Sequence, residues 1–261
     1  MRRAALALGL ALWGAAAGAC TVDPFSRSAY PGSLALNPDT GGAIRRAWFD
    51  GPVTRYDHGI LGRADEPSVL WVDAIGNAGL CGHALTLDDA HVFEDIAPRL
   101  ADLDGDGTDE VIVVRSHVAQ GAQLAVYRWT GDDLVLHAVT PYIGRRHRWL
   151  APVGVADLDG DGAMDLAYVD QPHLARVLRV WRHADGALTQ VAAAAGLTNH
   201  RIGEDFISGG IRDCGDGPEM VTANAGWSRL IATRLADGAL TARDIGAFAG
   251  PPSFAAALAC R

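Results

Sequence analysis

Two short segments of the chain carry carboxylates at every second position. The first reads ADLDGDGTDE over residues 101–110, and the second reads ADLDGDGAMD over residues 156–165. Calcium requires alternating oxygen ligands from one continuous loop, with a glycine at the sixth position for a sharp turn. Carboxylates this close repel one another unless a cation lies between them. The spacing therefore predicts about two Ca²⁺ ions with a structural role. The predicted ligands are Asp102, Asp104, Asp106, Thr108 and Glu110, and Asp157, Asp159, Asp161, Ala163 and Asp165.

The two loops differ from an EF-hand, which ends in a glutamate at its twelfth position and lies between two helices. Here the twelfth position is Val113 in one copy and Tyr168 in the other, and both lie in apolar runs. The ninth position, Glu110 or Asp165, closes the loop instead. In this pattern the seventh residue, Thr108 or Ala163, offers its backbone carbonyl oxygen.

Histidines also recur at regular positions in the sequence, each 7 to 13 residues before one of the aspartates at positions 65, 102, 157 and 213. Imidazoles with charged neighbours can hold a metal, an anion or a sugar-like ligand, or carry out acid–base chemistry. They can equally form hydrogen-bonded contacts between repeated units. If the repeats surround an axis, these side chains enter it from one side and form a candidate axial site. Its members are His58, His91, His147, His200, Arg146, Arg201 and Glu204.

The elements that position these residues form an internal repeat. The leading aspartates of three copies fall at positions 102, 157 and 213, and a weaker copy near Asp65 lacks the acidic loop. Each copy contains about four short apolar or alternating runs separated by turn residues, which is typical of β-strands. Four-stranded repeats of this length predict an all-β fold, a small β-propeller of about four blades. Five blades, recruiting residues 28–52, is the alternative.

The acidic pattern D-x-D-G-D-G-x-x-[DE], followed by an apolar strand, resembles the FG-GAP or VCBS repeat. This is the calcium-binding blade of integrin α-subunit propellers and of many exported bacterial proteins. The match is closest at 102–114 and 157–169, partial at 213–224 and weak at 57–74. The resemblance implies a propeller whose calcium loops connect the first two strands of a blade. The third loop, 213–219, is shorter and lacks an acid at its third position, so no calcium is expected there.

The remaining segments set the boundaries and the compartment. Residues 1–19 begin with two arginines and continue as an apolar run too short to span a bilayer, which predicts a signal peptide. Residues 20–52 are interpreted as an N-terminal extension with a possible closing strand at 44–53, residues 53–250 as the propeller, and residues 251–261 as a tail. Cys20 is a candidate lipid anchor, with plain cleavage as the alternative. The four cysteines allow three disulfide connectivities.

The net charge of −9 argues against a nucleic-acid partner, because phosphate binding needs a basic surface. The sequence contains no G-x-S-x-G, H-E-x-x-H or phosphate-loop motif. We therefore expect an exported calcium-binding module, in the periplasm or outer envelope, that binds a protein or glycan or serves as a scaffold. The alternative is a hydrolase or lyase at the axial site, which requires His147, His200 and Glu204 to converge.

Overall fold

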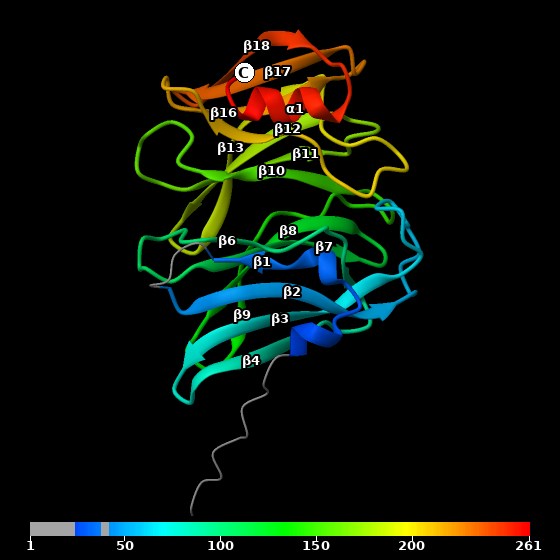
Figure 1. The fold of residues 1–261 in the computed structure, drawn as a ribbon, viewed down its shortest axis with the longest axis vertical. Coiled ribbons are helices and arrows are strands. Elements are labelled where there is room, and N and C mark those ends of the chain that lie inside the picture. Colours follow the sequence, from blue (N-terminus) through cyan, green and yellow to red (C-terminus); the bar gives the residue numbers. More distant parts are fainter. Residues whose placement is uncertain (1–23, 38–41) are drawn as a thin grey trace, which may run out of the picture.

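The computed structural model describes residues 24–37 and 42–261 and confirms an all-β fold (Figure 1). Its strands form antiparallel sheets that follow one another along the chain. The predicted signal peptide and Cys20 lie outside the described residues. Within the described part of the chain, no helix is long and apolar enough to cross a membrane.

The first and second sheets are built from the N-terminal half of the chain. The first sheet has the order β1 (Ala35–Leu36), β2 (Ile44–Val53), β3 (Glu66–Gly76) and β4 (Gly79–Thr86). The second sheet contains β5 (His91–Phe93), β6 (Arg99–Ala101), β7 (Glu110–His117), β8 (Gly121–Trp129) and β9 (Leu134–Val139). Both β5 and β6 pair with β7, so two short segments share the place of one strand.

The third and fourth sheets repeat the same antiparallel order. The third contains β10 (Leu150–Ala156), β11 (Asp165–Asp170), β12 (Val177–Ala184) and β13 (Ala187–Ala195). The fourth contains β14 (Leu197–Thr198), β15 (Gly210–Asp213), β16 (Pro218–Asn224), β17 (Arg229–Ala236) and β18 (Ala239–Ala247). The predicted repeats therefore correspond to sheets, and the acidic loops connect β6 to β7 and β10 to β11.

The weak first copy differs from its expected form. Residues 58–62, which precede Asp65 in this copy, form a loop with a turn at 59–62 and no strand, and Gly59 and Gly62 have φ angles of 63° and 78°. Such angles lie in the left-handed region that glycine adopts without a steric cost. The strand expected at 44–53 from the N-terminal side is present as β2, which pairs with β3.

Apolar side chains between successive sheets form the core. Each large side chain that is fully buried stabilises the fold by about 1.5–3 kcal/mol relative to an exposed one. Phe49 and Phe93 stack across the first interface with ring centroids 5.1 Å apart. The other interfaces are filled by hydrophobic clusters, with Ile112 and Leu150 in the second and Val169 and Met220 in the third.

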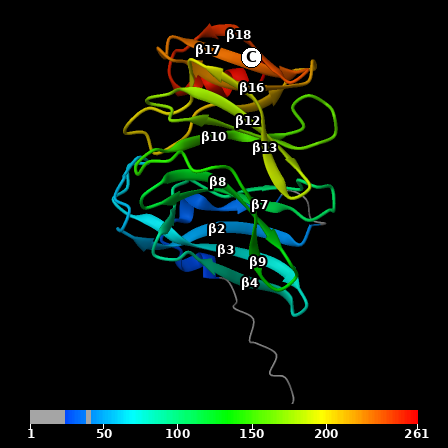
Figure 2. The same ribbon diagram turned by 180° about the vertical axis from the view of Figure 1, so that it is seen from behind.

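The first and fourth sheets lie at opposite ends of the molecule, as Figures 1 and 2 show. On the first sheet, Trp48 stacks on Trp71 and meets the edge of Phe25 from the short 3-10 helix η1 (Pro24–Arg27). A second 3-10 helix, η2 (Pro31–Ser33), follows it. On the fourth sheet, the helix α1 (Pro251–Leu258) buries Phe254, and a disulfide joins Cys214 to Cys260. Segments near the chain ends therefore cover both terminal sheets.

Candidate calcium loops and histidine cleft

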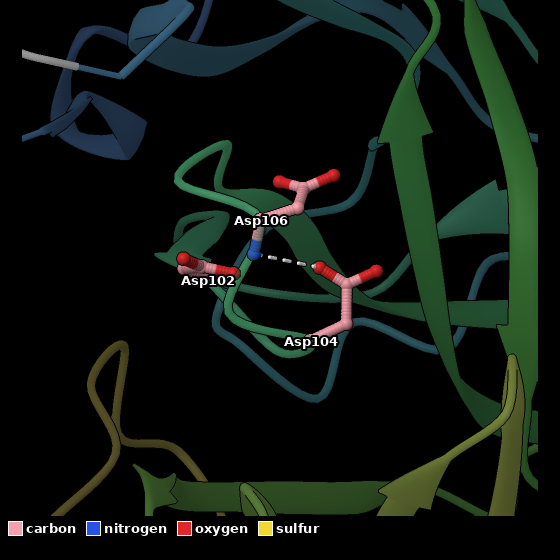
Figure 3. A group of neighbouring side chains, drawn as sticks. All are labelled: Asp102, Asp104 and Asp106. Atoms are coloured by element: carbon pink, nitrogen blue, oxygen red, sulfur yellow. Dashed lines mark hydrogen bonds between the residues drawn. The ribbon is translucent and has the colours of Figure 1, made fainter.

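The first acidic loop folds around the carboxylate of Asp102 (Figure 3). That carboxylate accepts backbone N–H hydrogen bonds from Gly105 at 2.7 Å and Gly107 at 2.8 Å. Both glycines have positive φ, 76° and 84°, which lets the chain turn back within a few residues. Ligand oxygens of Asp102, Asp104 and Asp106 lie within 4.8 Å of one another. The loop thus gathers three of its predicted ligands at one place.

The second acidic loop repeats this arrangement. Asp157 accepts N–H hydrogen bonds from Gly160 at 2.8 Å and Gly162 at 2.9 Å, and its carboxylate groups with those of Asp159 and Asp161. Oδ1 of Asp159 is buried and has no hydrogen-bond partner within residues 24–37 and 42–261. A buried carboxylate oxygen without a donor is costly unless a cation binds it. The second loop therefore fits a calcium ion.

The ninth-position acids begin β7 and β11 and are fully buried. Glu110 accepts an N–H hydrogen bond from Leu103 at 2.9 Å, and Asp165 accepts one from Leu158 at 3.3 Å. These bonds fasten the second residue of each loop to the following strand. The seventh residues, Thr108 and Ala163, donate their N–H groups to the fifth-position aspartates at 2.7 and 2.9 Å.

Two arginines share the loop carboxylates. Arg128 pairs with Glu110 at 3.1 Å and also with Asp104. Arg182 pairs with Asp165 at 3.0 Å and reaches Asp159 and Asp161, two of the clustered acids, at 2.8 and 2.6 Å. Burial raises the pKa of Glu110 to about 7, and repulsion from nearby loop aspartates adds to the shift. Burial also raises the pKa of Asp165, against the effect of Arg182. The single positive charge of one arginine therefore does not neutralise all the carboxylates of either loop.

The third copy has a different fastening. Asp213 accepts N–H hydrogen bonds from Gly215 at 2.8 Å and Gly217 at 3.1 Å, so its turn resembles the other two. Cys214, within the turn, is held by its disulfide to Cys260. Glu219 pairs with the guanidinium groups of Arg212, Arg234 and Arg243. A disulfide and an arginine cluster therefore secure this loop.

His58 and His147 lie side by side, with ring centroids 4.8 Å apart and nearly parallel planes. Nδ1 of His58 forms a hydrogen bond with the carboxylate of Glu94. Glu94 is buried, and this burial raises its pKa. Nε2 of His147 lies 2.8 Å from the carbonyl oxygen of Tyr56. Arg146 donates to the same carbonyl, also at 2.8 Å. Three members of the candidate axial site are thus gathered.

The other members lie in two further places. His200 is fully buried. Its Nδ1 lies 2.9 Å from Nε2 of His173, and its Nε2 lies 3.0 Å from the carbonyl oxygen of Glu204. Arg201 places its guanidinium over the ring of Trp227. His91 belongs to β5, where it contacts Asp88 and Tyr142. His147 and His200 therefore have different hydrogen-bond partners.

A cavity of about 190 Å³ is lined by His58, His147, Trp149 and His173. His173 was not among the residues predicted for the candidate axial site. It ends the repeat segment 151–173, as His117 ends the matching segment 97–117, and this repeated position is a signal that could have indicated it. The recurring histidines occupy different local structures, because His58 lies in a loop and His91 within the strand β5.

The contact between the half-buried His173 and the fully buried His200 predicts acid sensitivity. Burial, reinforced by repulsion from His200 and His58, lowers the pKa of His173 to about 4. Because the unfolded-state pKa is near 6.5, neutral His173 stabilises the fold above that pH, and this contribution is lost as the pH falls toward 4. In urea unfolding, His173→Gln should make this pH dependence shallower by up to about 1.4 kcal/mol per pH unit. An unchanged slope would contradict the assignment.

Residues 98–168 match the family of FG-GAP-like repeats, which confirms the predicted resemblance over both acidic loops. The comparison with curated proteins gives no match. Similar solved structures include rhamnogalacturonan lyase YesW, at 15% identity and a TM-score of 0.37, covering 71% of this chain and 44% of that chain. The exotype rhamnogalacturonan lyase YesX is 14% identical with a TM-score of 0.38, covering 81% and 50%. The chain therefore spans half or less of each structure.

Proposed function

We propose that the chain is an exported calcium-binding module that binds a protein or glycan, or serves as a scaffold, in the bacterial envelope. The observation that carries the proposal is the pair of equivalent carboxylate clusters headed by Asp102 and Asp157. The FG-GAP-like match spans both clusters. Export is supported by the sequence of residues 1–19 and remains part of the proposal.

Calcium would stiffen the connection between β6 and β7 in the second sheet and the connection between β10 and β11 in the third. The clustered aspartates supply negatively charged oxygens, and Oδ1 of Asp159 lacks a donor within the described residues. Calcium supplies the positive charge that the loop oxygens need to lie close together. At the millimolar calcium levels outside cells, even a weak site would be filled.

The surface beside the two loops supports a binding role. A cavity of about 800 Å³ is lined by Asp102 and Asp104 of the first loop and Gly162 and Ala163 of the second. Arg128, which also lines it, contributes a guanidinium group. Concave surfaces of this size are typical of ligand sites. Filled calcium loops would add positive charge at both edges of this cavity.

The test is a calorimetric calcium titration of the chain from residue 20 onward, with thermal unfolding followed in calcium and in chelator. We expect two equivalents of calcium to bind. Each site that is filled at 100 times its dissociation constant should add about 2.7 kcal/mol to the free energy of unfolding. No calcium binding, or a melting temperature indifferent to chelator, would reject the calcium role and would leave only a scaffold without metal.

A second candidate, a hydrolase or lyase at the histidine cleft, is favoured by one contact. The buried carboxylate of Glu94 holds Nδ1 of His58, and such a partner orients an imidazole for proton transfer at its other nitrogen. The test is turnover of a panel of polysaccharides and esters. His58→Gln should abolish any turnover found while calcium binding persists; turnover that survives this change would reject the assignment.

A further inference from the structure

Each of the four sheets places a buried acidic residue at the same position, the start of the strand that follows the loop. In the second, third and fourth sheets these residues are fully or almost fully buried and follow the acidic loops. The first sheet has such a residue although its acidic loop is missing. The four residues are Glu66, Glu110, Asp165 and Glu219.

In three sheets, a guanidinium group from the next strand neutralises this acid. The three contacts measure 3.1, 3.0 and 3.2 Å, and they join Glu110 to Arg128, Asp165 to Arg182 and Glu219 to Arg234. The strand register explains the repetition, because Asp165 and Arg182 are direct cross-strand partners and the other two pairs continue the registers of their sheets. Each buried carboxylate thus has a cation beside it.

The first sheet lacks this guanidinium. Thr86, the last residue of β4, pairs with Val69, so the strand ends before it reaches Glu66. Residues 79–89 contain no arginine or lysine. Oε1 of Glu66 accepts the backbone N–H of His58 at 3.0 Å. Oε2 is buried and has no hydrogen-bond partner in the described part of the chain, and the residue is only 6% exposed.

A cleft of about 410 Å³ lies beside this carboxylate, and Glu66 is one of its lining residues. Two other charged residues that line the cleft are already engaged. Arg63, which also lines the cleft, is held by Asp65 at 3.0 Å and lies over the ring of Tyr30. Asp95 is paired with Arg99 at 2.8 Å. Glu66 is therefore the deep carboxylate of this cleft for which the structure shows no cationic partner among the described residues.

We propose that this cleft binds an organic cation with a guanidinium head group, which occupies the place that arginine occupies in the other three sheets. Burying an ionised carboxylate without a partner is costly, and a guanidinium donates paired N–H groups to it. Apolar side chains line the same cleft and can cover an alkyl chain; they include Ile60, Phe93 and Ile96. The cation can be a free alkylguanidine or an arginine side chain presented by a polypeptide.

The inference does not require the calcium loops to be filled, because none of the predicted calcium ligands lines the cleft. It names a ligand class for the binding role proposed above. Its failure would leave the calcium titration unaffected, and failure of that titration would leave the cleft unaffected.

The experiment measures binding of two probes by calorimetry, with calcium held at 1 mM. Agmatine represents a free alkylguanidine, and an acetylated and amidated Gly-Gly-Arg-Gly-Gly peptide represents an arginine side chain. We expect one of them to bind with one-to-one stoichiometry and to raise the melting temperature. Glu66→Gln should weaken this binding at least tenfold, because the amide keeps the side-chain size but loses the charge. The preferred probe identifies the source of the cation.

Two further variants make the outcome decisive. Glu219→Gln changes the matching acid of the fourth sheet, and it should lower stability while leaving probe affinity unchanged. Arg63→Ala removes the one cationic side chain that lines the cleft within residues 24–37 and 42–261, so that it cannot occupy the site in place of a probe. The proposal is overturned if neither probe binds to the native chain or to Arg63→Ala. It is also overturned if Glu66→Gln does not weaken the binding of a probe.

Discussion

Asp157→Ala is expected to remove about 4 kcal/mol from the free energy of unfolding in millimolar calcium. Asp157 heads the second loop, and its carboxylate both accepts two glycine N–H groups and belongs to the acidic cluster. Loss of a site filled at 100 times its dissociation constant accounts for about 2.7 kcal/mol of that loss. For a chain of this size, the melting temperature should fall by several degrees. Asp102→Ala should have a similar effect in the first loop.

Chelator separates the calcium contribution from the turn itself. In chelator, Asp157→Ala should cost only its lost N–H hydrogen bonds, about 1 kcal/mol. Asp213→Ala is the matched control, because Asp213 accepts the same kind of turn hydrogen bonds in a loop without the clustered acids. Its effect should be small and identical with and without calcium, since the disulfide at Cys214 holds that turn. Equal losses in calcium at Asp102, Asp157 and Asp213 would contradict the distinction between the loops.

The sequence was sufficient to predict the parts of the molecule that are local. Alternating acids and glycines determine the turns at 102–107 and 157–162, because each turn is closed by hydrogen bonds within a few residues. The repeat predicted the succession of antiparallel strands for the same reason.

Contacts between distant segments were only partly predictable from one sequence. The recurring histidines predicted that His58 and His147 lie near one another, whereas no residue pattern indicated the contact of His58 with the buried Glu94. The weak repeat forms no strand at residues 58–62, where Gly59 and Gly62 favour a turn. The unpaired position of Glu66 also depends on where β4 ends, and strand ends are poorly determined by sequence.

Arg182→Met is expected to lower the free energy of unfolding in chelator by about 3 kcal/mol, because it leaves the fully buried Asp165 without its guanidinium partner. Calcium should reduce this loss. The guanidinium contacts Asp159 and Asp161, which also belong to the acidic cluster, so the ion and the arginine neutralise the same carboxylates. The variant should therefore bind calcium several-fold more tightly at this loop.

Urea unfolding in calcium and in chelator measures both effects. Adding Asp165→Leu to Arg182→Met should recover much of the loss in chelator, because the buried charge is removed together with its partner. Arg229→Met is the control, since Arg229 and Asp244 form an exposed pair that should add little to stability. If calcium protects Arg182→Met no better than it protects Arg229→Met, the ion and the guanidinium do not share these acids. The second loop would then be fastened by Arg182 alone, and its aspartates would not constitute a calcium site.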